Sequence, residues 1–229
     1  MKLLTVGNTK TRKGEAFGYL THILHLAPSW QSGFNTCPMA SKGCAAACLN
    51  TSGLGRFANV QAARTRKTLQ YFNDRETFMD MLASDIHAGI RKADREGLIP
   101  TFRLNGTSDI RWENVPLGSQ PNVMSEFSGI TFYDYTAIPN RRDIPDNYHL
   151  TFSRKEDNEA ATLQWLANGG NAAVVFDVLP ETWNGYPVID ATVHDLRFLD
   201  PRNVVAGLTE KGKAADDLSG FVVRSQGAA

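Results

Sequence analysis

Short apolar runs alternate with helical segments along this chain, and that alternation is the strongest constraint on its fold. The runs have the length and composition of buried strands. They occupy residues 21–28, 101–106, 129–136, 148–153, 172–178, 187–192 and 203–209. Helical periodicity occurs at residues 57–72, 78–93 and 157–168. The middle helix is the clearest, because Asp74 is placed to cap its start and Gly97 to end it.

Strands separated by helices are typical of parallel βα units. The runs are almost continuously apolar, as expected for a sheet that is covered on both faces. We therefore predict an α/β protein in which residues 1–229 form a single (β/α) TIM-barrel-like domain. This prediction includes a barrel that is incomplete or irregular. The alternative is an open doubly wound sheet, although no Gly-x-Gly-x-x-Gly motif follows the first strand.

Composition adds a limit on binding partners. The 229 residues include 24 basic and 24 acidic side chains, which gives zero net charge. Polyanion binding through bulk charge is therefore excluded, whereas a local basic groove is still allowed. The chain contains no apolar run that could span a bilayer and begins without a signal-peptide pattern. We expect no membrane partner and a cytoplasmic location.

All three cysteines of the chain fall in one short segment. Cys37, Cys44 and Cys48 have the spacing Cys-x6-Cys-x3-Cys. An odd number of cysteines cannot all pair as disulfides, which a reducing cytosol disfavours in any case. Cys44 and Cys48 are separated by about one helical turn, so their thiols can share a helix face. Small residues around them leave room for a bulky group.

Three converging thiolates need a cation. The spacing favours a [4Fe–4S] cluster held by Cys37, Cys44 and Cys48, which leaves one iron open. A zinc site is the alternative, although zinc usually takes four ligands and no Cys-x-x-Cys pair is present. Unligated, packed thiols are a third interpretation. The spacing also differs from the Cys-x3-Cys-x2-Cys of most radical S-adenosylmethionine enzymes, which weakens any prediction of that chemistry.

Polar residues follow several predicted strands, at the end where a barrel has its active site. The candidate catalytic residues are Arg103, Asp109, Asp177 and Asp190. Arg103 and Asp109 are preferred, because an arginine inside an apolar strand needs an acceptor. The structural alternatives are a turn cap for Asp177 and a helix N-cap for Asp109. A surface ion pair between Asp195 and Arg197 is a further structural expectation.

Basic residues cluster in the first predicted helix. Arg64, Arg66 and Lys67 suit contacts to the phosphates of a nucleic acid. A solvated helix face is the more ordinary interpretation.

Several of these segments resemble one protein family. TCPMASKGCAAAC, FRLNGTSD, FYDYT, PVIDATVHDLRFLDP and GLTEKGKA are similar to segments of an uncharacterised phage-encoded family, whose members are sometimes labelled rolling-circle replication proteins. The resemblance implies a barrel-like fold, an iron–sulfur cluster on Cys37, Cys44 and Cys48, and the cytosol of a bacterial host. Arg103 and Asp109 match the family's second-strand motif, in which the glycine of this chain is displaced.

The leading functional hypothesis is an iron–sulfur protein with an open iron that takes a small molecule or nucleotide, either as a redox protein or as an enzyme of unassigned reaction. The alternative is a replication-associated, nucleic-acid-binding protein with a structural zinc or a redox-sensing cluster. One-electron transfer is a third class.

Overall fold

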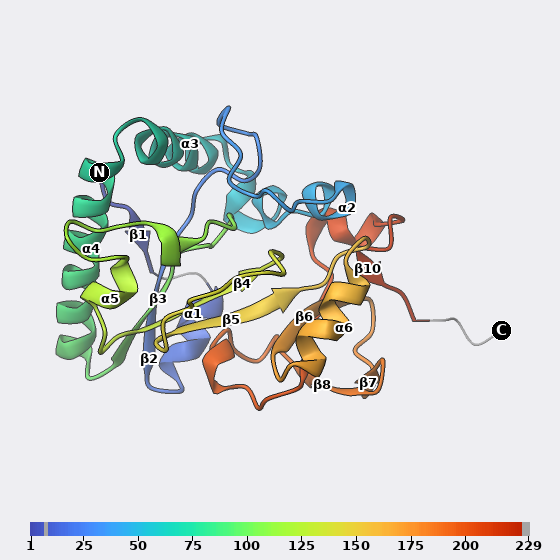
Figure 1. The fold of residues 1–229 in the computed structure, drawn as a ribbon. Coiled ribbons are helices and arrows are strands. Elements are labelled where there is room, and N and C mark those ends of the chain that lie inside the picture. The colour runs from blue at the N-terminus through green and yellow to red at the C-terminus, as the bar shows by residue number, and fades with distance from the viewer. Residues whose placement is uncertain (7–8, 226–229) are drawn as a thin grey trace.

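The computed structural model of the chain describes residues 1–6 and 9–225. One ten-stranded sheet runs through these residues (Figure 1). Its order is β1-β2-β3-β4-β5-β6-β9-β8-β7, and β10 lies beside β6. The strands are β1 Leu4–Thr5, β2 Tyr19–Leu24, β3 Ile99–Arg103, β4 Thr131–Thr136, β5 Tyr148–Ser153, β6 Asn171–Phe176, β7 Thr182–Trp183, β8 Tyr186–Asp190, β9 Val205–Thr209 and β10 Val222–Val223.

The predicted TIM-barrel-like fold is wrong, because the sheet of the described residues is open. The pairs from β2 to β6, and then to β9 and β8, are parallel. A short antiparallel strand lies at each end, β1 against β2 and β7 against β8. Closing a barrel requires the two end strands to pair with each other. Among the described strands, β1 and β7 have one neighbour each, so the sheet is not closed into a barrel. The α/β class is confirmed.

Six α-helices and five short 3-10 helices connect the described strands. The α-helices are α1 Thr9–Glu15, α2 Lys42–Ala46, α3 Ala58–Asn73, α4 Arg75–Glu96, α5 Val123–Glu126 and α6 Glu159–Ala167. The 3-10 helices are η1 Leu49–Thr51, η2 Gly53–Arg56, η3 Trp112–Asn114, η4 Arg197–Leu199 and η5 Gly212–Asp216. The three predicted helices correspond to α3, α4 and α6. Asp74 caps α4 by accepting from the Thr77 amide at 3.4 Å. Gly97 ends α4 with φ 67°, a conformation that glycine tolerates best.

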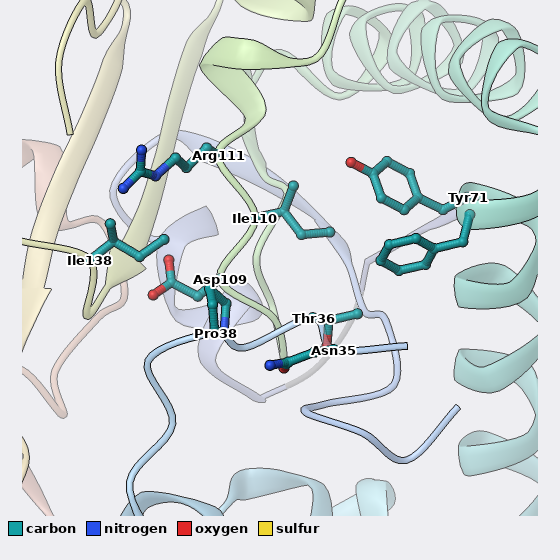
Figure 2. Close-up of a pocket in the computed structure, with 9 residues that line it drawn as sticks. Asn35, Thr36, Pro38, Tyr71, Asp109, Ile110, Arg111 and Ile138 are labelled. Atoms are coloured by element: carbon teal, nitrogen blue, oxygen red, sulfur yellow. The ribbon is translucent and has the colours of Figure 1, made fainter. Parts of the chain in front are cut away.

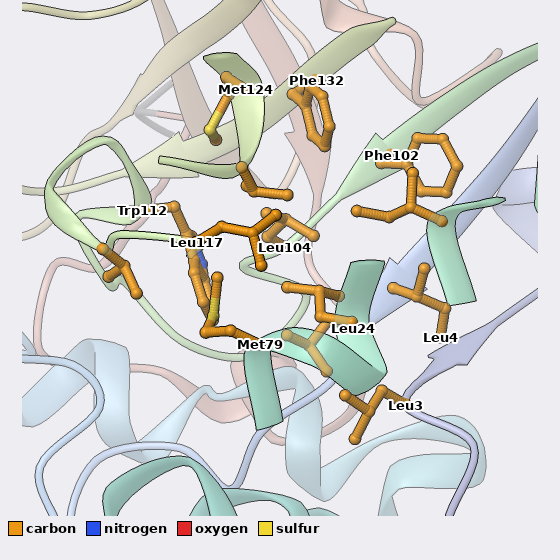
Figure 3. Close-up of a cluster of buried hydrophobic side chains, with 14 of the residues drawn as sticks. Leu3, Leu4, Leu24, Met79, Phe102, Leu104, Trp112, Leu117, Met124 and Phe132 are labelled. Carbon is orange, nitrogen blue, oxygen red and sulfur yellow. The ribbon is translucent and has the colours of Figure 1, made fainter. Parts of the chain in front are cut away.

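The main hydrophobic core lies between α4 and the first strands of the sheet. Phe102 and Phe132, from β3 and β4, are fully buried in it beside Leu24 and Leu104 (Figure 3). His22 stacks on Phe102 with ring centroids 5.2 Å apart. A Cβ added at Gly89 of α4 would lie 3.1 Å from the His22 ring, so glycine lets the helix approach the sheet closely.

A segment that follows β8 covers the opposite face of these strands. Phe198, in η4, contacts the rings of Tyr19, Tyr133 and His149. Beside it, Thr21 hydrogen-bonds both Thr101 at 2.9 Å and Tyr133 at 3.1 Å. Each strand here is therefore buried on both faces, which explains why its sequence is almost continuously apolar.

None of the helices in the described part of the chain has the length and apolar character needed to cross a membrane.

Candidate functional site

The cysteine segment crosses the carboxyl edge of the parallel strands. It begins after β2, and its anchors come from the loops after neighbouring strands (Figure 1). After β3, the Asp109 amide donates to the Thr36 carbonyl at 2.8 Å, and the Thr107 hydroxyl donates to the Leu26 carbonyl at 2.5 Å. Because these strands are parallel, their ends and the loops after them meet at one edge of the sheet.

Glu156, in the loop after β5, anchors the start of α2. Its carboxylate accepts from the Ser41 hydroxyl at 2.8 Å and from the Gly43 amide at 2.7 Å. Ser41 in turn caps the helix by accepting from the Cys44 amide at 3.1 Å. A Cβ on Gly43 would lie 2.1 Å from Ser219 Oγ and 2.8 Å from the Glu156 carboxylate. Glycine is therefore required where three loops converge on the segment that carries Cys44.

Main-chain amides point at two of the three sulfur atoms. The Ser29 amide donates to Cys37 Sγ at 3.4 Å, and the Asn50 amide donates to Cys48 Sγ at 3.5 Å. Cys37 Sγ also lies 3.7 Å from the Thr107 carbonyl oxygen and 3.8 Å from the Thr36 hydroxyl. Amide donors of this kind stabilise a charged sulfur ligand and tune the group that it binds.

The three thiols are close enough to interact electrostatically. Burial raises the pKa of Cys44 to about 12, and the charges of Cys48 and Cys37 add to that rise. Burial likewise raises the pKa of Cys37 and of Cys48. Among the residues that the structure describes, no group of three or more His, Cys, Asp or Glu side chains could hold a metal ion.

The basic cluster predicted on α3 is not one exposed surface. Arg64 and Lys67 are buried, whereas Arg66 is exposed. Arg64 Nη1 donates to Asn50 Oδ1, and Lys67 Nζ donates to the Leu3 carbonyl. The solvated-face interpretation is therefore wrong for Arg64 and Lys67.

A cavity of about 230 Å³ opens beside Cys37 (Figure 2). Thr36 and Pro38, the two neighbours of Cys37, line it together with Tyr71 and Asp109. The other lining residues are Asn35, Phe72, Ile110, Arg111 and Ile138. Figure 2 shows the Asp109 carboxylate on one side of this space and the aromatic rings on the other. The cavity thus combines an apolar wall with a few polar groups, as small-molecule sites do.

The two preferred catalytic candidates lie at this edge but have structural partners. Arg103 is buried; burial alone would lower its pKa, but the adjacent Asp195 carboxylate raises it above its usual value. Asp109 accepts from the Thr136 hydroxyl and the Ala137 amide, both at 2.8 Å. Burial raises the pKa of Asp109. The N-cap alternative for Asp109 is wrong, because Arg111 is the residue that precedes η3.

The other two candidates accept main-chain hydrogen bonds at the surface; Asp177 is half-buried and Asp190 is exposed. Asp177 accepts from the Ser225 amide at 2.8 Å and from the Val178 amide at 2.6 Å. These hydrogen bonds lower its pKa. Asp190 accepts from the Thr192 amide at 2.8 Å. The Thr192 side chain and then its amide lower the pKa of Asp190.

Sequence reasoning missed two contacts that organise this region, those of Asp195 and Glu156. Asp195 is buried against Arg103, so the expected surface pair with Arg197 is wrong; Arg197 pairs with Asp200 at 3.1 Å instead. Glu156 anchors α2 from 113 residues further along the chain. In the sequence, only Arg103 indicated this arrangement, because an arginine inside an apolar strand needs an acceptor from elsewhere in the chain.

Comparison with known proteins gives one family. Residues 2–225 match the model of the gene product 88 (GP88) family. No curated protein and no solved structure matches the chain. The match covers nearly the whole chain and agrees with the phage-type family that the motifs resemble, so the chain belongs to the gene product 88 family.

Proposed function

We propose that this protein holds a [4Fe–4S] cluster through Cys37, Cys44 and Cys48 and presents one open iron to a small molecule or nucleotide. The observation that carries the proposal is that the three cysteines lie on one short segment and that main-chain amides donate to two of their sulfur atoms, to Cys37 Sγ at 3.4 Å and to Cys48 Sγ at 3.5 Å. They lie at the carboxyl edge of the sheet, where α/β proteins bind ligands.

The described residues include no group of side chains that would hold a single metal ion, so the proposal concerns a four-iron cluster with three thiolate ligands and not one zinc ion. Zinc binds thiolates at about 2.3 Å, so all of its ligands must crowd around one point. A four-iron cluster takes each thiolate on a different iron and accepts sulfur atoms that are farther apart. Amide donors to Cys37 and Cys48 are also suited to a cluster, whose sulfur ligands commonly accept hydrogen bonds.

The cavity beside Cys37 is the proposed ligand site. The negative charge of Asp109, which lines the cavity, raises the pKa of Cys37 and so acts at that sulfur. A cavity of about 230 Å³ suits a small molecule rather than a polymer. When bound, a cluster with an open iron supplies Lewis acidity or an electron. The chain's own groups at this place, Asp109 and the aromatic wall, orient the ligand and exclude water.

Anaerobic purification followed by iron and sulfide analysis tests the proposal. We expect about four irons and four sulfides per chain, with broad visible absorbance, and loss of both when Cys37, Cys44 or Cys48 is replaced by serine. Ser52→Ala is the matched control in the same segment and should keep the iron. Zinc without sulfide in the purified protein would overturn the proposal.

The open iron has its own test. Imidazole added to the reduced protein should change the electron paramagnetic resonance spectrum of the cluster, because it binds the iron that lacks a cysteine. An unchanged spectrum in a fully loaded sample would mean that a side chain of the protein occupies that iron.

A further inference from the structure

Arg64 is a buried arginine whose hydrogen-bonding groups are incompletely used. Its side chain projects from α3, and the residue is 9% exposed. Nη1 donates to Asn50 Oδ1, while Nε is buried with no hydrogen-bond partner in the described part of the chain. Burying a guanidinium is costly unless acceptors and an opposite charge surround it.

In the part of the chain that the structure describes, no carboxylate forms an ion pair with Arg64. The nearby ionisable groups of the same helix and of the strand end below it are basic. Burial lowers the pKa of Lys67 and of His25, and the charge of Arg64 adds to both effects. Lys67 has the negative charge of Asp85 nearby, so Arg64 is the cation without a matching anion.

The geometry directs Arg64 toward Cys48. Asn50 connects them, because its side-chain oxygen accepts from Arg64 and its main-chain amide donates to Cys48 Sγ at 3.5 Å. Asn50 is itself held by a hydrogen bond to Gln31 at 2.9 Å. Burial lowers the pKa of Arg64, and the charge of Cys48 opposes that lowering.

We infer that Arg64 is the positioning residue that supplies the counter-charge of the metal–sulfur group at Cys48 and raises its reduction potential. This inference rests on the proposed function. A cluster with three thiolate ligands carries net negative charge, and reduction adds one more electron. A fixed cation in a buried site therefore stabilises the reduced state more than the oxidised state.

The same arrangement has the opposite effect on the metal-free protein. Without a cluster Arg64 is a buried charge whose Nε has no hydrogen-bond partner and which forms no ion pair among the described residues. Replacing an uncompensated buried charge by a neutral side chain of similar length removes that desolvation cost. The arginine is thus expected to stabilise the loaded protein and to destabilise the metal-free one, which no purely structural arginine would do.

The experiment compares Arg64→Gln, Arg64→Lys and Arg66→Gln in the anaerobically loaded full chain. Arg66 lies on the same helix but is exposed, so it is the matched control. Arg64→Gln should lower the ratio of reduced to oxidised cluster at least tenfold at a fixed potential, a shift of about 59 mV for one electron. Arg64→Lys should keep most of the wild-type potential, and Arg66→Gln should keep all of it.

A second measurement uses the metal-free proteins. Arg64→Gln should melt about 2–4 °C higher than the wild type, and Arg66→Gln at the wild-type temperature. A loaded Arg64→Gln variant with the wild-type potential would overturn the inference and leave the cluster itself established. A metal-free Arg64→Gln protein that melts lower, or does not fold, would also overturn it, because Arg64 would then be a structural residue. Failure of the wild type to take up iron and sulfide would remove the proposed function and this inference together.

Discussion

The guanidinium of Arg103 and the carboxylate of Asp195 form a buried ion pair between β3 and the segment that follows β8. The two residues are 92 positions apart in the chain. Arg103 also lies over the ring of Tyr135, at 5.0 Å, and that tyrosine donates to Asp195 at 3.2 Å. The pair therefore holds the segment after β8 against the face of the sheet that lies opposite the main hydrophobic core.

Asp195→Ala should lower the free energy of unfolding by about 3–5 kcal/mol, because it leaves Arg103 buried without its main counter-charge. Urea denaturation measures this change. Asp190→Ala is the control, since Asp190 is exposed and accepts only locally from Thr192; it should cost less than about 1 kcal/mol. Equal effects of the two substitutions would contradict the importance assigned to the buried pair.

Gly106→Ala should destabilise the protein by about 1–3 kcal/mol through overpacking. A Cβ at this position would lie 2.6 Å from Ile23 Cγ2 and 2.7 Å from the Leu24 carbonyl oxygen, and the latter is main chain that cannot move aside. Gly129→Ala is the matched control, because nothing lies within 4 Å of its added Cβ. Thermal unfolding of both variants checks the prediction, which fails if Gly106→Ala melts with the control.

Stability should fall as the pH drops from about 6.5 toward 4. Burial lowers the pKa of His22 from 6.5 to about 4, so the unfolded chain takes up a proton in this range that the folded protein refuses. The stabilisation is complete above pH 6.5 and is lost as the pH falls, by up to about 3 kcal/mol for this one group. Burial also lowers the pKa of the half-buried His25, to about 3, which acts in the same direction.

Urea denaturation at pH 7 and at pH 4.5 measures that loss. His22→Leu should show a smaller difference between the two pH values than the wild type, whatever its stability at pH 7. His87→Gln, at an exposed histidine of α4, should keep the wild-type difference. Parallel pH profiles for wild type and His22→Leu would refute the assignment to His22.

Glu156→Gln should loosen the start of α2. The charged carboxylate accepts from both Ser41 and Gly43, and charge-assisted hydrogen bonds of this kind contribute about 1.5–3 kcal/mol. We expect lower stability of the metal-free protein and, if the cluster is present, faster loss of iron. Glu181→Gln, at an exposed position, is the control. A metal-free variant as stable as the wild type would show that Glu156 does not hold α2.

Local patterns were sufficient for the long elements. The period of apolar positions predicted α3, α4 and α6, and Asp74 and Gly97 act at the ends of α4 as their chemistry indicates. β5 covers the residues that were predicted for it. The two-residue strands β1 and β7 are too short for any periodic signal. They form the two antiparallel ends of the open sheet. Strands that alternate with helices occur in barrels and in open sheets, so this pattern could not decide between the two. The prediction of a closed barrel was wrong.

The candidate site divides in the same way. By itself the sequence determined the cysteine segment, its family resemblance and the need of Arg103 for an acceptor, because these follow from residue types and spacing along the chain. Only the tertiary structure decided that Asp195 meets Arg103, that Glu156 holds α2 and that Arg64 lies buried toward Cys48. Those contacts join residues far apart in the chain, and burial decides their energies, since an exposed charge is screened by water and a buried one must find a partner.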